Sequence, residues 1–254
     1  MQWSDLPSKD RKGSRPRCLL LTDESQGRDA VTARLSTLLA PHGIISTEDR
    51  WHPRGLMAPA EVMLHDASEV LPADQRVALR DWWLASRRSA RTPVWDLVST
   101  AWIGARRGLL LVEAKAHHSE LHEDGKALPD PESMGSIANH AKIGDAVAQA
   151  AAALEAATGR RVSLSLNSHY QLANRLAWGW KLATMGVPVV LLYLGFLGAT
   201  EWPDGFADDT EWSAAIHAHG VHVHPAVWGT TIDCGAAPLI PLLRTVRVDL
   251  PEPT

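Results

Sequence analysis

The sequence predicts an α/β fold in which a mixed central sheet is flanked by helices. Short apolar runs typical of buried strands alternate along the chain with longer segments whose apolar residues recur at helical spacing. The run VVLLYL at 189–194 is continuously apolar, as expected of a strand covered on both faces. The alanine-rich segment 139–158 instead places Ile143 and Leu154 on one face of a helix that ends at Gly159.

The chain has 254 residues, of which 45% are hydrophobic and 21% charged, so it is long enough for one large domain. Residues 1–16 carry Pro7, Gly13 and many charges and are predicted to form a flexible leader, which leaves 17–254 as a single α/β domain. Strands are predicted at 18–22, 92–103, 109–116, 162–167 and 189–194. Helices are predicted at 29–40, 59–64, 74–88, 139–158, 169–185 and 208–219.

The predicted strands 92–103 and 109–116 form the clearest local unit. The turn sequence GARRG at 104–108 separates them, which indicates an antiparallel hairpin. The following connection, 117–138, is rich in His, Asp, Gly and Pro. Connections of this length inside a compact domain tend to be functional or mobile.

Charge and cysteine content restrict the class of function. The net charge of -4 gives no overall basic character, so a polyanion would need a local patch such as the pair Arg87 and Arg88 could provide. Such arginine pairs are equally compatible with solvated element ends. Cys18 and Cys234 cannot build a disulfide framework, and no segment approaches the roughly 18 apolar residues of a membrane span. We therefore expect a soluble cytoplasmic protein with no membrane partner.

Glu113 and Lys115 stand at the end of an apolar strand, where charged groups are costly unless they are partnered. Strand side chains alternate between faces, so these two share one face, and the hairpin brings Asp96 near register with Glu113. Two such carboxylates can hold Mg²⁺, which offsets charge on a phosphodiester transition state and activates water. Lys115 could orient that water or stabilise negative charge. The alternative is a solvated ion pair on the sheet rim.

This pattern resembles the PD-(D/E)xK nuclease superfamily, in which an acid on one core strand is followed on the next strand by acid-x-Lys. The matching residues are Asp96 in PVWD and Glu113 and Lys115 in LLLVEAKAH, within elements that span residues 74–195. The resemblance implies a restriction-endonuclease-like three-layer core and hydrolysis of phosphodiester bonds with Mg²⁺ or Mn²⁺, with DNA as the expected partner. Asp96 departs from the family pattern because it lies three residues after Pro93 rather than directly after it.

The resemblance implies two further kinds of site residue. The family has an additional acid on the preceding helix, for which Glu61 is our candidate metal ligand and Glu69 and Asp81 are competitors. Some branches also contribute a glutamine from a helix that follows the catalytic strands.

One face of the predicted helix 169–185 could supply that glutamine. Gln171 and Arg175 lie on this face at helical spacing, together with Asn174, and such a face suits a phosphate or a stacked base. A plain solvent-facing surface would look the same. We take Gln171 and Arg175 as candidate substrate-binding residues, with His118 after the catalytic strand as a further candidate that could equally be an exposed loop residue.

Two other functions stay open on the sequence alone. The first is a non-catalytic binding module that keeps the nuclease fold and uses a charged cleft for nucleic acid or a protein partner. The second is a zinc hydrolase centred on His222 and His224, because VHVHP would place both imidazoles on one strand face. A homodimer is compatible with either. Tryptophans such as Trp82, Trp83 and Trp178 could line a base-stacking cleft or fill the core.

Overall fold

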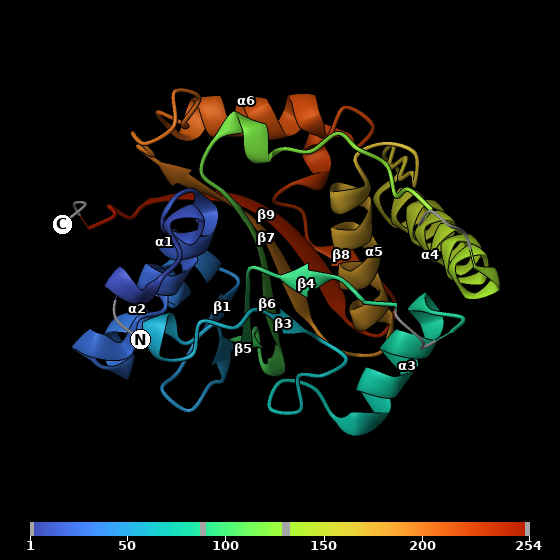
Figure 1. The fold of residues 1–254 in the computed structure, drawn as a ribbon. Helices are drawn as coiled ribbons and strands as arrows, with labels where there is room; N and C mark the ends of the chain where they lie inside the picture. Colours follow the sequence, from blue (N-terminus) through green and yellow to red (C-terminus); the bar gives the residue numbers. More distant parts are fainter. Residues whose placement is uncertain (1–2, 87–89, 129–132, 252–254) are drawn as a thin grey trace.

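The computed structural model describes residues 3–86, 90–128 and 133–251. A curled, mixed central sheet runs through the molecule with helices against both faces (Figure 1), which confirms the predicted α/β class. Its strands follow the order β1-β5-β6-β7-β9-β8, and β2 also pairs with β5. Their bounds are β1 Gly43–Ile44, β2 Trp51–His52, β5 Leu97–Ile103, β6 Arg106–Lys115, β7 Val189–Leu197, β8 Ile232–Asp233 and β9 Pro238–Arg247. A separate ribbon pairs β3 (Val62–Met63) with β4 (Val94–Trp95).

Helices cover the two faces of the sheet unequally. One face packs against α1 (Ser14–Leu21) and α2 (Arg28–Leu39), and the other against α3 (Ala73–Trp83), α4 (Met134–Thr158), α5 (Tyr170–Thr184) and α6 (Asp209–His219). Leu110 and Val112 of β6 face the first pair, whereas Leu109 and Leu111 face the other four. Because strand side chains alternate, Glu113 belongs to the face covered by α3 to α6. None of the described helices is both long and apolar enough to cross a bilayer.

Six 3-10 turns complete the described secondary structure. They are η1 Trp3–Asp5, η2 Ser8–Arg11, η3 Glu24–Gln26, η4 Gly55–Met57, η5 His118–Glu120 and η6 Pro225–Val227. Residues 3–16, predicted to be a leader, include η1, η2 and the start of α1. Leu6 is buried there, the Gly13 amide donates to Glu201, and Arg17 of α1 forms an ion pair with the same carboxylate.

The predicted hairpin is confirmed as β5 and β6. The pair is antiparallel with Leu97 opposite Val112, and Gly104 adopts a left-handed backbone conformation (φ 57°) at the tight turn. Continuing the register by one residue sets Asp96 opposite Glu113. On its other side β6 runs parallel to β7, so Glu113 lies opposite Tyr193.

Three predicted elements are wrong. Residues 18–22 belong to helix α1 instead of a strand, because a short apolar run does not distinguish a buried helix from a buried strand. Residues 59–64 contain strand β3 and no helix. The alternating segment 162–167 forms no strand. Its pairing is limited to an isolated bridge between Val162 and Val223, in the loop after α6.

Strand β9 was not among the predicted strands; it holds Pro238 and Pro241, although proline is unusual inside a sheet. The structure accommodates Pro241 by orientation. The Pro241 carbonyl accepts a hydrogen bond from the Gly229 amide and therefore points away from β7. The nitrogen and carbonyl of one strand residue point to the same side, so the Pro241 nitrogen also faces away from β7. The β7–β9 ladder therefore loses no hydrogen bond at this proline.

Tryptophans fill the core between α3 and α5. Trp83 and Trp178 are fully buried, and their ring centroids lie 5.7 Å apart in an edge-to-face arrangement. Trp82 contacts both rings. Trp83 and Trp178 therefore serve packing and are not available as a base-stacking surface, whereas Trp82 is only partly buried.

Candidate active site

Asp96, Glu113 and Lys115 meet where the β5–β6 hairpin ends. Glu113 and Lys115 share one face of β6, and the Lys115 Nζ lies 2.5 Å from Glu113 Oε1. Asp96 precedes β5, and its Oδ2 accepts a hydrogen bond of 2.7 Å from the backbone amide of Ala114. This bond fixes the Asp96 carboxylate against β6 between the other two residues.

Arg175 of α5 completes this cluster from the helix layer. Its Nε donates to Glu113 Oε2 at 2.5 Å and its Nη2 donates to the Val94 carbonyl at 2.7 Å. The guanidinium also lies 4.4 Å from the centroid of the Trp95 ring. Arg175 is only 5% exposed, so it holds the Glu113 carboxylate in place rather than extending from an exposed helix face.

The charges in the cluster are almost, but not fully, balanced. Burial raises the pKa of Glu113, but the cations of Arg175 and Lys115 outweigh that effect and hold the pKa below its usual value. Burial lowers the pKa of Lys115, yet Glu113 and Asp96 raise it above the usual value, so its ammonium is charged at neutral pH. Burial raises the pKa of Asp96 to about 7 and Glu113 adds to this rise, against the opposing effect of Lys115 and Arg175. Of the two carboxyls, Asp96 is therefore the one whose charge is costly.

The cluster offers a cation the carboxylate oxygens of Asp96 and Glu113, although both Glu113 oxygens are already paired with Lys115 and Arg175. Among the described residues no three His, Cys, Asp or Glu side chains are arranged to hold a metal ion. Mg²⁺ needs only one or two carboxylates, because water and substrate oxygens complete its shell. Asp96 Oδ1 accepts no hydrogen bond from any described residue. A cation beside it would also remove the repulsion from Glu113 that contributes to its raised pKa.

Glu61 is the best placed of the three candidate additional acids. Burial raises its pKa and Arg15 opposes that rise, while the charges of Glu113 and Arg175 also act on it, so Glu61 lies within electrostatic range of the cluster. Its carboxylate lies 3.7 Å from Arg15 of α1. Glu69 instead lies by His52 on the surface, and Asp81 is paired with Arg80. Glu61 enters from the β3 side of the ribbon and not from a helix.

Of the other two candidate substrate-binding residues, Gln171 lies next to the cluster and His118 does not. Gln171 lines a cavity of about 360 Å³ together with Asn174 and Arg175, so it lies next to the cluster. His118 does not line that cavity; its Nε2 lies 3.0 Å from a carboxylate oxygen of Glu211 on α6.

The two histidines of the zinc alternative do not share a strand face. Residues 221–225 form no strand. His222 Nδ1 lies 2.8 Å from an Arg161 guanidinium nitrogen, whereas His224 Nδ1 accepts from the Ala226 amide and begins η6. Each imidazole therefore has its own local partner.

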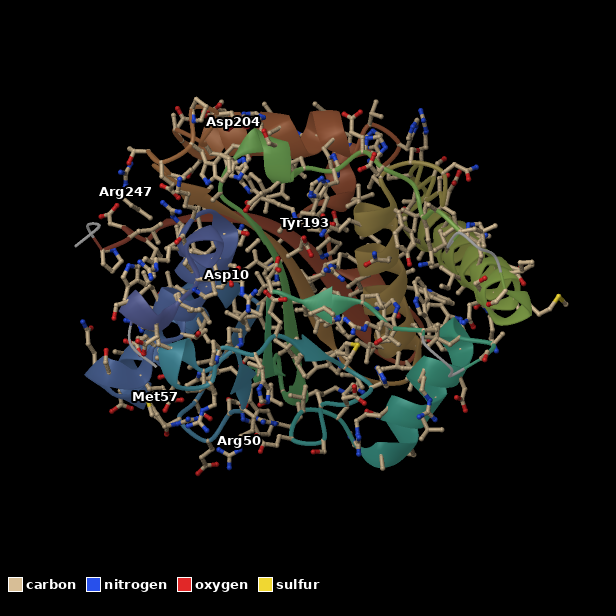
Figure 2. All side chains as sticks on the ribbon, in the orientation of Figure 1. Asp10, Arg50, Met57, Tyr193, Asp204 and Arg247 are labelled. Atoms are coloured by element: carbon tan, nitrogen blue, oxygen red, sulfur yellow. The ribbon has the colours of Figure 1, made fainter. Side chains whose placement is uncertain are left out.

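Sequence reasoning missed Tyr193, which lies in the interior on β7 (Figure 2). It pairs with Glu113 in the parallel register, and its buried hydroxyl has no hydrogen-bond partner among the described residues. Its position could be inferred only from the pairing of β6 with β7.

Comparison with known proteins adds no relative, since no family model, no curated protein and no solved structure matches the chain.

Proposed function

We propose that the protein is a metal-dependent nuclease of the PD-(D/E)xK type, which hydrolyses phosphodiester bonds, in DNA in the first instance, with Mg²⁺ or Mn²⁺. The observation that carries this proposal is the meeting of Asp96, Glu113 and Lys115 at one end of the hairpin, with Asp96 left partly uncompensated. A surface ion pair of the kind common on sheet rims does not account for it, because Glu113 has no exposed surface.

The arrangement of elements supports the proposal of a restriction-endonuclease-like fold. An antiparallel β5–β6 hairpin is followed by helices and by β7, which runs parallel to β6. Helices cover both faces, so the core has three layers. This order is similar to the restriction-endonuclease-like core.

Each residue of the cluster has a distinct chemical role. Asp96 and Glu113 would hold the metal, with Glu61 as a third acid close by; the bound ion would supply Lewis acidity and an activated water. Lys115 is charged at neutral pH, so it stabilises negative charge at the reacting phosphate or orients the water and does not act as the base. Arg175 is a positioning residue for Glu113.

One observation favours the alternative of a binding module without catalysis. Both oxygens of Glu113 are already paired with cations, and Lys115 is only 6% exposed. A substrate phosphate would therefore reach Lys115 only after local rearrangement. A module that merely binds nucleic acid does not need that step.

The test is incubation of purified protein with plasmid, linear and single-stranded DNA and with RNA, with and without Mg²⁺ or Mn²⁺. We expect metal-dependent cleavage that Asp96→Asn abolishes. Asp66→Asn, which changes an exposed aspartate, is the matched control and should cleave normally. Absence of cleavage on every substrate, with nucleic acid bound and no Mg²⁺ or Mn²⁺ affinity, would establish the binding module instead.

A further inference from the structure

Two cavities lie beside the catalytic cluster and share the same two walls. The smaller, of about 360 Å³, is lined by Val94, Gly125 and Arg175 among others. The larger, of about 510 Å³, is lined by Arg91 and Lys126 from the neighbouring positions of the same two segments. The two cavities therefore occupy neighbouring positions along these segments, the smaller one at Arg175 and the larger one at the start of α4.

Lys126 lines the larger cavity, and its neighbour Gly125 lines the smaller one. Its side chain is half-buried, and its Nζ lies 5.1 Å from the centroid of the Tyr170 ring. No Asp or Glu among the described residues forms an ion pair with it, and burial lowers its pKa. The backbone is fixed at this point, because the Lys126 amide donates to Leu166 and its carbonyl pairs with His140. An ammonium on a fixed backbone, with no counter-ion among the residues that the structure describes, is suited to an anionic ligand.

The larger cavity combines an apolar wall with a polar rim. Leu84 and Ile143 are buried side chains on its wall, and Leu128 also lines it. Arg91 and His140 lie at the same cavity, on the polar side. This combination matches a nucleotide, whose base has apolar faces and whose phosphate is anionic.

We propose that the two cavities act as one groove that binds an unpaired strand of nucleic acid, with one phosphate at Lys126 and the adjoining base in the larger cavity. This inference deepens the proposed nuclease function and rests on it for the orientation of the strand toward Asp96 and Glu113. A base can enter a cavity only when it is unstacked, which selects single strands over intact duplex. Asp124 lines the smaller cavity, so its carboxylate repels a phosphate there and favours the Lys126 side.

Binding should be measured by fluorescence anisotropy with a labelled single-stranded oligonucleotide and with its duplex, using the Asp96→Asn protein so that cleavage does not interfere. Lys126→Gln in this background should weaken single-strand binding about 3- to 10-fold and reduce the salt slope by about 0.7, the value for one lost phosphate contact on a single strand. The matched control is Lys181→Gln, because the Lys181 ammonium also lies over an aromatic ring, 5.5 Å from Trp82, but outside both cavities.

A second variant tests the base position. Ala127 lines the larger cavity and is exposed, so Ala127→Trp narrows the cavity without disturbing the core and should weaken single-strand binding with an unchanged salt slope. Equal binding by Lys126→Gln and Lys181→Gln, or duplex binding as tight as single-strand binding, would overturn the groove. Cleavage by the wild-type protein reports separately on the nuclease function, so either proposal can fail while the other stands.

Discussion

Two fully buried carboxylates lie near opposite ends of the β5–β6 hairpin, Asp49 from the segment between β1 and β2 and Glu113 from β6 itself. They differ in which groups compensate their charge. Asp49 lies toward the turn, where its Oδ1 accepts from the Thr100 hydroxyl and the Arg107 guanidinium at 2.6 Å, and its Oδ2 accepts from the amide and hydroxyl of Ser46. Burial raises the pKa of Asp49, but these donors outweigh it and the pKa lies below its usual value. Asp49 is thus complete as it stands.

Glu113, at the other end, forms ion pairs with Lys115 and Arg175, and a second carboxyl, that of Asp96, lies beside it. The raised pKa of Asp96 marks a charge that the protein alone does not satisfy. Structural carboxylates are normally compensated as Asp49 is, whereas a site that must receive a metal and a substrate retains an unmet charge. The contrast therefore separates a structural acid from a candidate catalytic one at opposite ends of a single hairpin.

The largest expected effect is on cleavage by two matched amide variants. Glu113→Gln should lower kcat by about 10²- to 10³-fold or more, because it removes a metal ligand and transition-state charge compensation. Asp49→Asn should leave kcat within about threefold while lowering the free energy of unfolding by about 1–3 kcal/mol, since its four donors lose a charged acceptor. Single-turnover cleavage and urea unfolding measure the two quantities. The contrast would be broken if Asp49→Asn impaired cleavage as severely as Glu113→Gln.

Arg175→Lys should reduce kcat roughly 10- to 100-fold with little change in KM, because lysine cannot hold Glu113 and the Val94 carbonyl together. Weaker positioning also raises the pKa of Glu113, so the acid limb of the pH–rate profile should move to higher pH. Steady-state kinetics across pH measure both. A rise in KM alone would identify Arg175 as a substrate-binding residue, the role that its helix spacing indicated.

Asp96→Asn should stabilise the protein at neutral pH by on the order of 1–3 kcal/mol. The folded-state pKa of Asp96, about 7, lies above the unfolded value of 3.8. The protonated carboxyl therefore stabilises the fold fully below pH 3.8, and this stabilisation is lost as the pH rises to 7. Asparagine does not titrate and can still accept from the Ala114 amide. The gain should therefore vanish below about pH 4 and be complete above pH 7, in thermal unfolding at several pH values. A variant less stable than the wild type at pH 8 would contradict the assignment of unmet charge to Asp96.

The sequence predicted the hairpin and its acidic end because those features are local. An apolar strand, a short turn and alternating side chains are enough to bring Asp96, Glu113 and Lys115 together. Arg175 was named from the sequence but with another role, since its contact with Glu113 depends on how α5 packs over β6. The unpredicted strand β9 and the helix at 18–22 depended likewise on tertiary contacts, through the orientation of Pro241 and the burial of α1 on the sheet.

The smallest expected effect is proton release on metal binding. At pH 6 most Asp96 carboxyls are protonated, given a pKa of about 7, and Mg²⁺ must displace that proton to bind. Calorimetric titration in two buffers of different ionisation enthalpy should therefore show release of nearly one proton per Mg²⁺ at pH 6 and almost none at pH 8.5. Asp49→Asn should behave as the wild type does, because Asp49 is already ionised at both pH values. Binding without proton release at pH 6 would mean that the metal, if held here, does not use Asp96, and the distinction between the two ends of the hairpin would then rest on Glu113 alone.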